Sequence, residues 1–213
     1  MTMEKQIAVF DFDGTLIRGD SVVALLFFAR SKGCLSLPEL LAAGWYGLRY
    51  RLRLTDALTA KGRSHAFLAR MKDTERQAFL REFAGTLTAR LYKDGLAQIQ
   101  KHRAQGRLVI LCSASCACYM QYVAETLAVD ALLCTPSADD GTVMGPNCRG
   151  EEKVRRVYAW LDQHKMSHGC IAAAYGDTAG DAPILRASLH PVLVNAKKKL
   201  RGLLPNAERV NWQ

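Results

Sequence analysis

Aspartate residues in this sequence follow short apolar runs, where they could bind a cation or act as nucleophiles. Asp11 and Asp13 come directly after the apolar run 6–10, and residues two apart in an extended chain point to the same side. Two carboxylates held so close repel one another unless a cation lies between them, and carboxylate oxygens are ligands that Mg²⁺ prefers. Gly14 allows a sharp turn after the pair. The pair predicts a Mg²⁺ site, and the structural alternative is a polar strand end followed by a helix cap.

Four further polar residues fall beside other strand ends or helix starts. Ser113 follows a second apolar run, and Asp177 and Asp181 follow a third. Lys153 lies in the first turn of a predicted helix. Taken singly, Ser113 would more often cap a helix and Lys153 would more often be a solvated charge. Because ligands bind beyond the carboxyl ends of the strands in open α/β sheets, we expect these residues to gather beside the first aspartate pair.

The elements that must position these residues alternate between strand and helix. Apolar runs predict buried parallel strands over 6–10, 107–112, 171–175 and 190–194, and a weaker one over 131–134. Helical patterns lie between them over 95–104, 115–128, 151–165 and 180–188, and a hairpin turn is predicted over 135–146. This alternation predicts an α/β fold, a three-layer Rossmann-like parallel sheet with helices on both faces.

The segment 16–93 is predicted to be helical throughout. We expect Ser21 to cap a helix that runs to Lys32, a capping box to begin at Ser36, and a second such box at Thr74 to begin a helix that runs to Ala89. The expected organisation is an α/β core formed by residues 1–15 and 94–213, into which residues 16–93 are inserted as an all-helical cap.

Together these elements resemble the four motifs of the haloacid dehalogenase superfamily of phosphohydrolases. The resemblance rests on Asp11 with Asp13, on Ser113, on Lys153, and on Asp177 with Asp181, and it covers the chain outside the helical segment. The helical segment is similar to the cap of the phosphoserine-phosphatase-like branch (subfamily IB). The resemblance implies an enzyme, a phosphatase that hydrolyses phosphoric monoesters.

The resemblance also implies a role for each motif residue. Asp11 would be the nucleophile that forms an aspartyl-phosphate, and Asp13 would be the general acid and then the general base. Mg²⁺ would be held by Asp11, the main-chain carbonyl of Asp13, and Asp177. Ser113 and Lys153 would hold the phosphoryl oxygens.

Two further positions bear on the site and its substrate. Asp181 would orient Lys153, or it would support the metal indirectly by holding the residues that bind it. Asp20 stands where phosphoserine phosphatases usually carry a glutamate, and it would contact the substrate. Ala114 and Ser115 stand where those enzymes usually have glycines. These departures argue against phosphoserine itself as the substrate. The expected substrate is a small phosphorylated metabolite, and phosphoserine-like compounds stay among the candidates. The sequence leaves the substrate and the oligomeric state open.

Charge and composition limit the other classes of function. The chain has 213 residues, and segment 16–93 carries 14 Lys or Arg against 6 Asp or Glu, which is most of the net charge of +9. No helix-turn-helix, zinc-finger or RNA-binding signature accompanies this charge, so a nucleic-acid-binding module is the weakest alternative and no nucleic-acid partner is expected. No apolar stretch approaches the ~20 residues of a spanning helix, and no signal peptide is evident. We expect a soluble, cytoplasmic protein.

A lipid head-group phosphatase working at a membrane surface is the other alternative. Residues 42–53 bring aromatic and basic side chains together, as on an interfacial helix. We favour the interpretation that Trp45 and Tyr46 pack between helices while the arginines are solvated, because no long one-sided apolar face is evident in the sequence.

Overall fold

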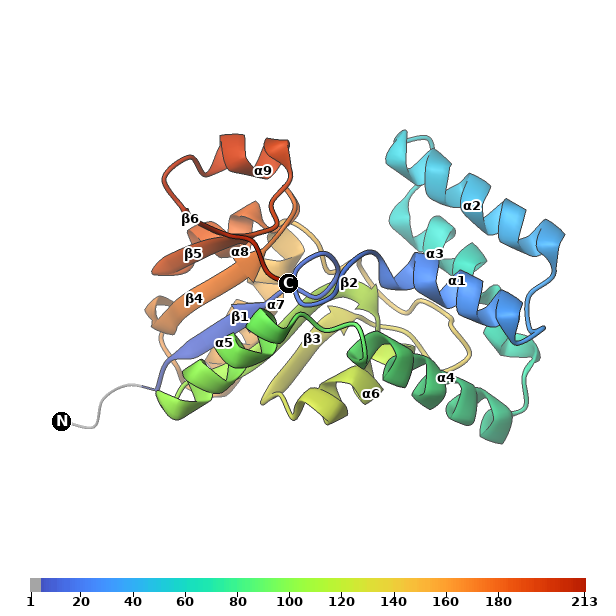
Figure 1. The fold of residues 1–213 in the computed structure, drawn as a ribbon, viewed down its shortest axis with the longest axis horizontal. Coiled ribbons are helices and arrows are strands. Elements are labelled where there is room, and N and C mark those ends of the chain that lie inside the picture. The colour runs from blue at the N-terminus through green and yellow to red at the C-terminus, as the bar shows by residue number, and fades with distance from the viewer. Residues whose placement is uncertain (1–4) are drawn as a thin grey trace.

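A six-stranded parallel sheet forms the centre of the part of the chain that the computed structural model describes, residues 5–213 (Figure 1). Its strand order is β3-β2-β1-β4-β5-β6, and every neighbouring pair is parallel. The direction of connection therefore reverses between β1 and β4, and ligands of such sheets bind at this reversal. The strands are β1 (Ile7–Phe10), β2 (Leu108–Cys116), β3 (Ala131–Thr135), β4 (Ile171–Gly176), β5 (His190–Val194) and β6 (Glu208–Val210).

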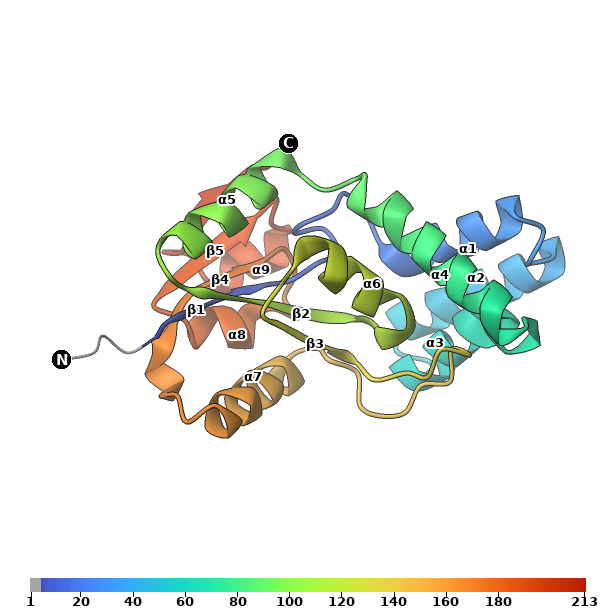
Figure 2. The ribbon, with the colours of Figure 1, turned by 90° about the horizontal axis from the view of Figure 1, so that it is seen from below.

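Helices cover both faces of the sheet (Figure 2). Alternate residues of β1 point to opposite faces: Phe10 packs with α5 and α6, while Val9 packs with α7, α8 and α9. Apolar side chains on both faces explain why the strands read as continuous apolar runs. The helices are α5 (Lys93–Ala104), α6 (Ala117–Leu127), α7 (Glu151–Gln163), the short 3₁₀ helix η2 (His168–Cys170), α8 (Ala182–Arg186) and α9 (Lys198–Leu203). The predicted three-layer α/β fold is confirmed.

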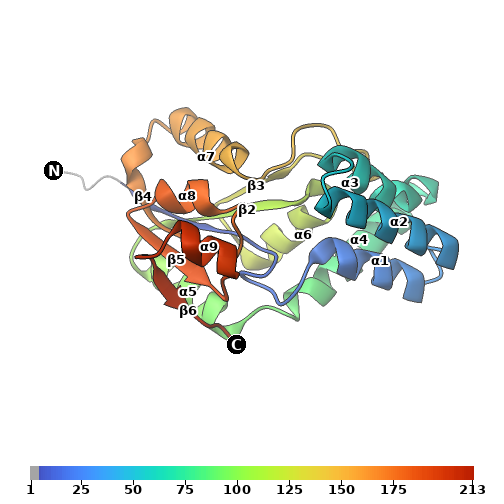
Figure 3. The same ribbon diagram turned by 90° about the horizontal axis from the view of Figure 1, so that it is seen from above.

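Between β1 and α5 the chain forms a second group of helices beyond the carboxyl ends of the strands (Figures 1 and 3). They are α1 (Ser21–Ser31), α2 (Leu37–Arg51), α3 (Ala57–His65), the 3₁₀ helix η1 (Ala66–Arg70) and α4 (Asp73–Thr88). We call this group the helical insert. The segments that lead into and out of the helical insert are hydrogen-bonded to each other, because the Tyr92 N–H donates to the Leu16 carbonyl at 2.9 Å.

Several predicted helix starts differ from those observed. Asp20, and not Ser21, caps α1, because its carboxylate accepts the N–H groups of Val22 and Val23. The capping box at Ser36 is confirmed. The one expected at Thr74 is wrong: α4 begins at Asp73, without a side-chain cap.

Other predicted boundaries shift by a few residues. Strand β2 runs to Cys116, four residues beyond its predicted end, because the pairing with β3 resumes there after an irregularity. Helix α6 begins correspondingly later, and helix α5 begins at Lys93, the last residue assigned to the helical segment by sequence. Helix α3 falls within the segment predicted to be helical throughout, whereas helix α9 and strand β6 were not predicted. The expected turn over 135–146 is present, with one antiparallel bridge between Ser137 and Val143.

No helix within residues 5–213 has both the length and the apolar character needed to cross a membrane.

Candidate active site

A buried lysine joins two carboxylates where β1 ends. Lys153 donates from Nζ to Asp11 Oδ1 at 2.6 Å and to Asp181 Oδ1 at 2.7 Å. Asp11 follows β1, Lys153 lies in the first turn of α7, and Asp181 immediately precedes α8. Burial opposes the charge of Lys153, yet Asp11 and Asp181 raise the pKa of this lysine well above its ordinary value. The lysine is therefore a permanent cation that holds Asp11 in place.

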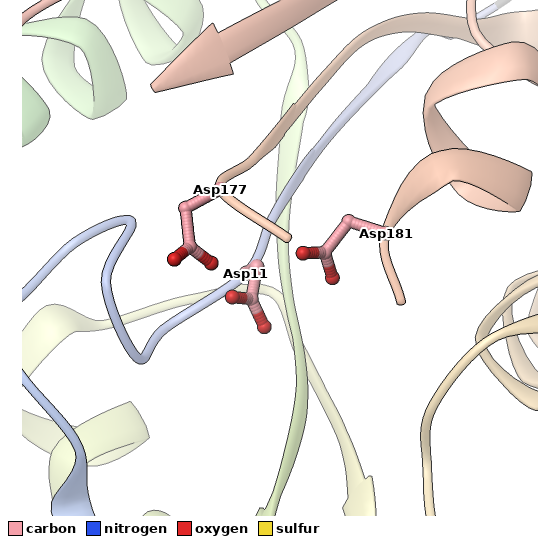
Figure 4. A group of neighbouring side chains, drawn as sticks. All are labelled: Asp11, Asp177 and Asp181. Carbon is pink, nitrogen blue, oxygen red and sulfur yellow. The ribbon is translucent and has the colours of Figure 1, made fainter. Parts of the chain in front are cut away.

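Asp177 completes an acidic cluster at the reversal of the sheet. One ligand atom from each of Asp11, Asp177 and Asp181 lies within 4.8 Å of the others (Figure 4). Burial, and then the charge of Asp181, raises the pKa of Asp11 to about 6. Burial, and then the charge of Asp11, raises the pKa of Asp177 to about 7. Both carboxyls would thus be more stable with a cation between them.

The surroundings of Asp177 fit a divalent cation. Its Oδ1 atom is buried and has no hydrogen-bond partner within the described part of the chain, while Oδ2 lies 3.5 Å from Lys197 Nζ. Gly14, at φ +77°, turns the chain against this carboxylate so closely that an added Cβ would lie 2.3 Å from Oδ2. An unpartnered buried carboxylate oxygen beside two other carboxylates matches the oxygen ligands that Mg²⁺ takes.

Asp13 is held by hydroxyl groups. Its Oδ1 accepts the Ser21 N–H at 2.6 Å, and its Oδ2 accepts the hydroxyls of Ser21 at 3.0 Å and Ser115 at 2.5 Å. Burial, and then the charge of Asp20, raises the pKa of Asp13 to about 7. A carboxyl whose pKa lies close to neutral pH is suited to give and take a proton.

Ser113 lies at the same edge of the sheet. The sequence predicted that β2 ends at this residue, but the strand continues to Cys116. Leu111 pairs with Phe10, so Ser113 on β2 lies just beyond the strand position beside Asp11. Its side chain is fully buried, and its Oγ accepts the N–H of Ser115 at 3.1 Å. The structure thus brings Asp11, Lys153, Asp177 and Asp181 into one cluster and places Ser113 on the adjacent strand.

Asp20 lies outside this cluster. Its side chain caps α1, and it lines a groove of about 450 Å³ between α1 and the end of α4. Arg18 and Arg90 line the same groove, together with the apolar side chains of Val23 and Phe27. Its predicted contact with substrate stays a prediction, for which the groove offers a place.

Sequence reasoning missed three residues that organise the site. Ser21 and Ser115 bind Asp13, and only the position of Ser115, two residues after Ser113 in an extended segment, could have signalled a shared side. Lys61 of α3 donates to the Ala114 carbonyl, and also to Thr135 Oγ1 at 3.0 Å. Burial lowers the pKa of Lys61, and no sequence pattern marks it.

A parallel sheet with a buried acidic cluster at its reversal point defines an α/β protein with a candidate metal site. Residues 8–186 match the family of haloacid dehalogenase-like hydrolases, and the chain belongs to this family. Protein CicA of Caulobacter vibrioides is 33% identical over 195 residues, which cover 87% of this chain and 84% of that protein.

Solved structures share the fold of this chain. A protein of unknown function from Bordetella pertussis Tohama I has a TM-score of 0.88 at 25% identity, covering 98% of this chain and 99% of that one. A phospho-aspartyl intermediate analogue of phosphoserine phosphatase has the same fold, with a TM-score of 0.66 at 16% identity over 97% of this chain and 92% of that one. The predicted membership of the haloacid dehalogenase superfamily is confirmed by the family match, and the phosphoserine phosphatase structure shares the fold.

Proposed function

We propose that this protein is a Mg²⁺-dependent phosphomonoester hydrolase that acts through an aspartyl-phosphate on Asp11. The observation that carries this proposal is the pairing of buried Asp11 with Lys153, next to the unpartnered oxygen of Asp177. In this proposal residues 1–15 and 94–213 form the phosphatase core, and residues 16–93 form a cap over it. The substrate is a small phosphorylated metabolite.

The first half-reaction transfers the phosphoryl group to the protein. An Asp11 carboxylate oxygen attacks phosphorus, and the bond from phosphorus to the ester oxygen breaks. Lys153 and the hydroxyl of Ser113 hold phosphoryl oxygens. Mg²⁺, held by Asp11, Asp177 and the main-chain carbonyl of Asp13, would supply positive charge that offsets the repulsion between carboxylate and phosphate.

Asp13 handles the protons of both half-reactions. In its protonated form it gives a proton to the leaving alkoxide, and the resulting carboxylate then takes a proton from the water that attacks the aspartyl-phosphate. The bond between phosphorus and Asp11 breaks, and inorganic phosphate leaves. The raised pKa of Asp13, about 7, supports this double role.

In this proposal the organic part of the substrate binds in the groove that Asp20 lines. Arg18 and Arg90 offer positive charge, and Val23 and Phe27 offer apolar contact. The basic surplus of the helical insert would draw anionic substrates towards the site.

The test is Mg²⁺-dependent release of phosphate from a panel of phosphorylated metabolites by the wild type and by Asp11→Asn. Asp11→Asn should abolish turnover, because an amide cannot form the acyl phosphate, while the fold is kept. Asp162→Asn is the matched control, since Asp162 is an exposed aspartate of α7 whose partner is the exposed His168. Near-normal turnover in purified Asp11→Asn, or turnover that survives removal of Mg²⁺ with EDTA, would refute the proposal.

A further inference from the structure

One face of α2 is apolar and exposed along its whole length. The side chains on it are spaced by three or four residues and are between 46% and 65% exposed: Leu37, Leu41, Trp45, Leu48 and, directly after the last helical residue, Leu52. At 3.6 residues per turn these five side chains fall within an arc of about 80° around the helix axis. We call them the α2 stripe. On the opposite face, Ala43 is buried and Leu40 packs against the core.

The structure therefore overturns the interpretation of this segment from sequence. Trp45 does not pack between helices, since it is 57% exposed, and the one-sided apolar face judged absent is present. Tyr46 is half-buried, with the guanidinium of Arg63 5.2 Å from its ring centre. The stripe escaped notice because apolar residues of the buried face alternate with those of the exposed face along the sequence.

Positive charge borders the stripe. Arg49 and Arg51 lie about 40° beyond its two edges on the helix surface. Arg51 and Arg53 are exposed and form no ion pair within residues 5–213. An apolar stripe with basic residues along its edges is the pattern of helices that lie in the interface of anionic membranes.

We propose that the α2 stripe docks this protein on the surface of an anionic lipid bilayer. A bilayer offers both an apolar layer for the leucines and Trp45 and phosphate groups for the arginines. This proposal concerns binding alone and does not depend on the phosphatase activity.

The experiment measures partition of the full-length protein onto vesicles, by sedimentation. One set of vesicles is phosphatidylcholine alone, and the other contains a third phosphatidylglycerol. We expect binding to the anionic set only, weakening as salt rises, because exposed charges are screened over about 8 Å at physiological ionic strength.

Three variants divide the contributions. Leu41→Gln combined with Trp45→Gln should lower partition about tenfold or more, since both side chains would lose their apolar contact. Arg51→Gln combined with Arg53→Gln should lower it several-fold and flatten its salt dependence. Leu189→Gln is the control, because Leu189 is 59% exposed but lies just before β5, at the end of the sheet away from the helical insert.

Tryptophan fluorescence gives a second readout that requires no disruptive variant. Trp45 emission should shift to the blue on anionic vesicles and be quenched by brominated acyl chains. Trp45→Phe should keep binding but lose most of this signal, since Trp160 and Trp212 are half-buried on the core. Absence of binding to anionic vesicles, equal binding by the Leu41 and Trp45 double variant, or a dimer in light scattering that this double variant dissociates would each overturn the proposal.

Discussion

Replacing Gly14 with alanine should impair the site far more than it impairs the fold. Gly14 lies at φ +77°, and the new Cβ would lie 2.3 Å from Asp177 Oδ2. The carboxylate would have to retreat by about 1 Å to reach ordinary contact, and a misplacement of that size costs about 10²-fold in rate. We therefore predict a loss of about 100-fold in kcat, together with roughly tenfold weaker Mg²⁺ binding.

Gly33 provides a matched control. It has nearly the same backbone angle, φ +73°, but no atom lies within 4 Å of an added Cβ. Alanine in the left-handed region costs about 1–2 kcal/mol at either position. Gly33→Ala should therefore show this loss of stability with unchanged kcat and unchanged Mg²⁺ affinity.

The assay combines three measurements on both variants: urea unfolding, Mg²⁺ binding by calorimetry, and phosphate release as a function of Mg²⁺ concentration. The difference between Gly14→Ala and Gly33→Ala isolates the contact with Asp177 from the backbone cost. If the two variants retain the same kcat and bind Mg²⁺ equally, the close approach of Gly14 to Asp177 does not position a metal ligand, and the reasoning fails.

Three further predictions concern protons and the join between the insert and the sheet. Asp13→Asn should slow hydrolysis of alkyl phosphates more than that of p-nitrophenyl phosphate, whose leaving group needs no proton; equal losses would assign Asp13 to the metal or the fold. Burial lowers the pKa of His65 from 6.5 to about 4. As the pH falls, His65 is therefore protonated in the unfolded chain before it is protonated in the folded chain, and the folded state loses stability between pH 6.5 and pH 4. The expected loss in the free energy of unfolding is about 2 kcal/mol at pH 5 relative to pH 7.5. The raised pKa values of Asp11, Asp13 and Asp177 change stability with pH in the opposite sense. The measurement therefore compares urea unfolding of the wild type and of His65→Gln at both pH values. The same pH dependence in both proteins would contradict the prediction for His65. Lys61→Met should cost about 2 kcal/mol, because it removes the hydrogen bonds by which Lys61 joins the insert to Ala114, Thr135 and Asn147. Arg63→Met at the exposed neighbouring position should cost little, and equal unfolding free energies of the two variants would contradict this.

Local patterns in the sequence were enough to predict the fold class and the residues of the acidic site. The run that ends at Phe10 is apolar because both of its faces are buried, and this marks a parallel strand. Because parallel strands end at one edge, Asp11 and Asp177 could be expected side by side although 166 positions separate them in the numbering. The first turn of α7 likewise placed Lys153 there. Each of these inferences needed only the period of an element and the position of its end.

Tertiary packing decided what those patterns could not. The hydroxyls of Ser21 and Ser115 meet on Asp13 from segments far apart in the chain, and Lys61 reaches the Ala114 carbonyl from the helical insert. No local period encodes such contacts, because they depend on how one element lies against another. The same reason applies to α2: its sequence has apolar residues on two faces, and only the position of its neighbours determines that Ala43 is buried while Trp45 faces solvent.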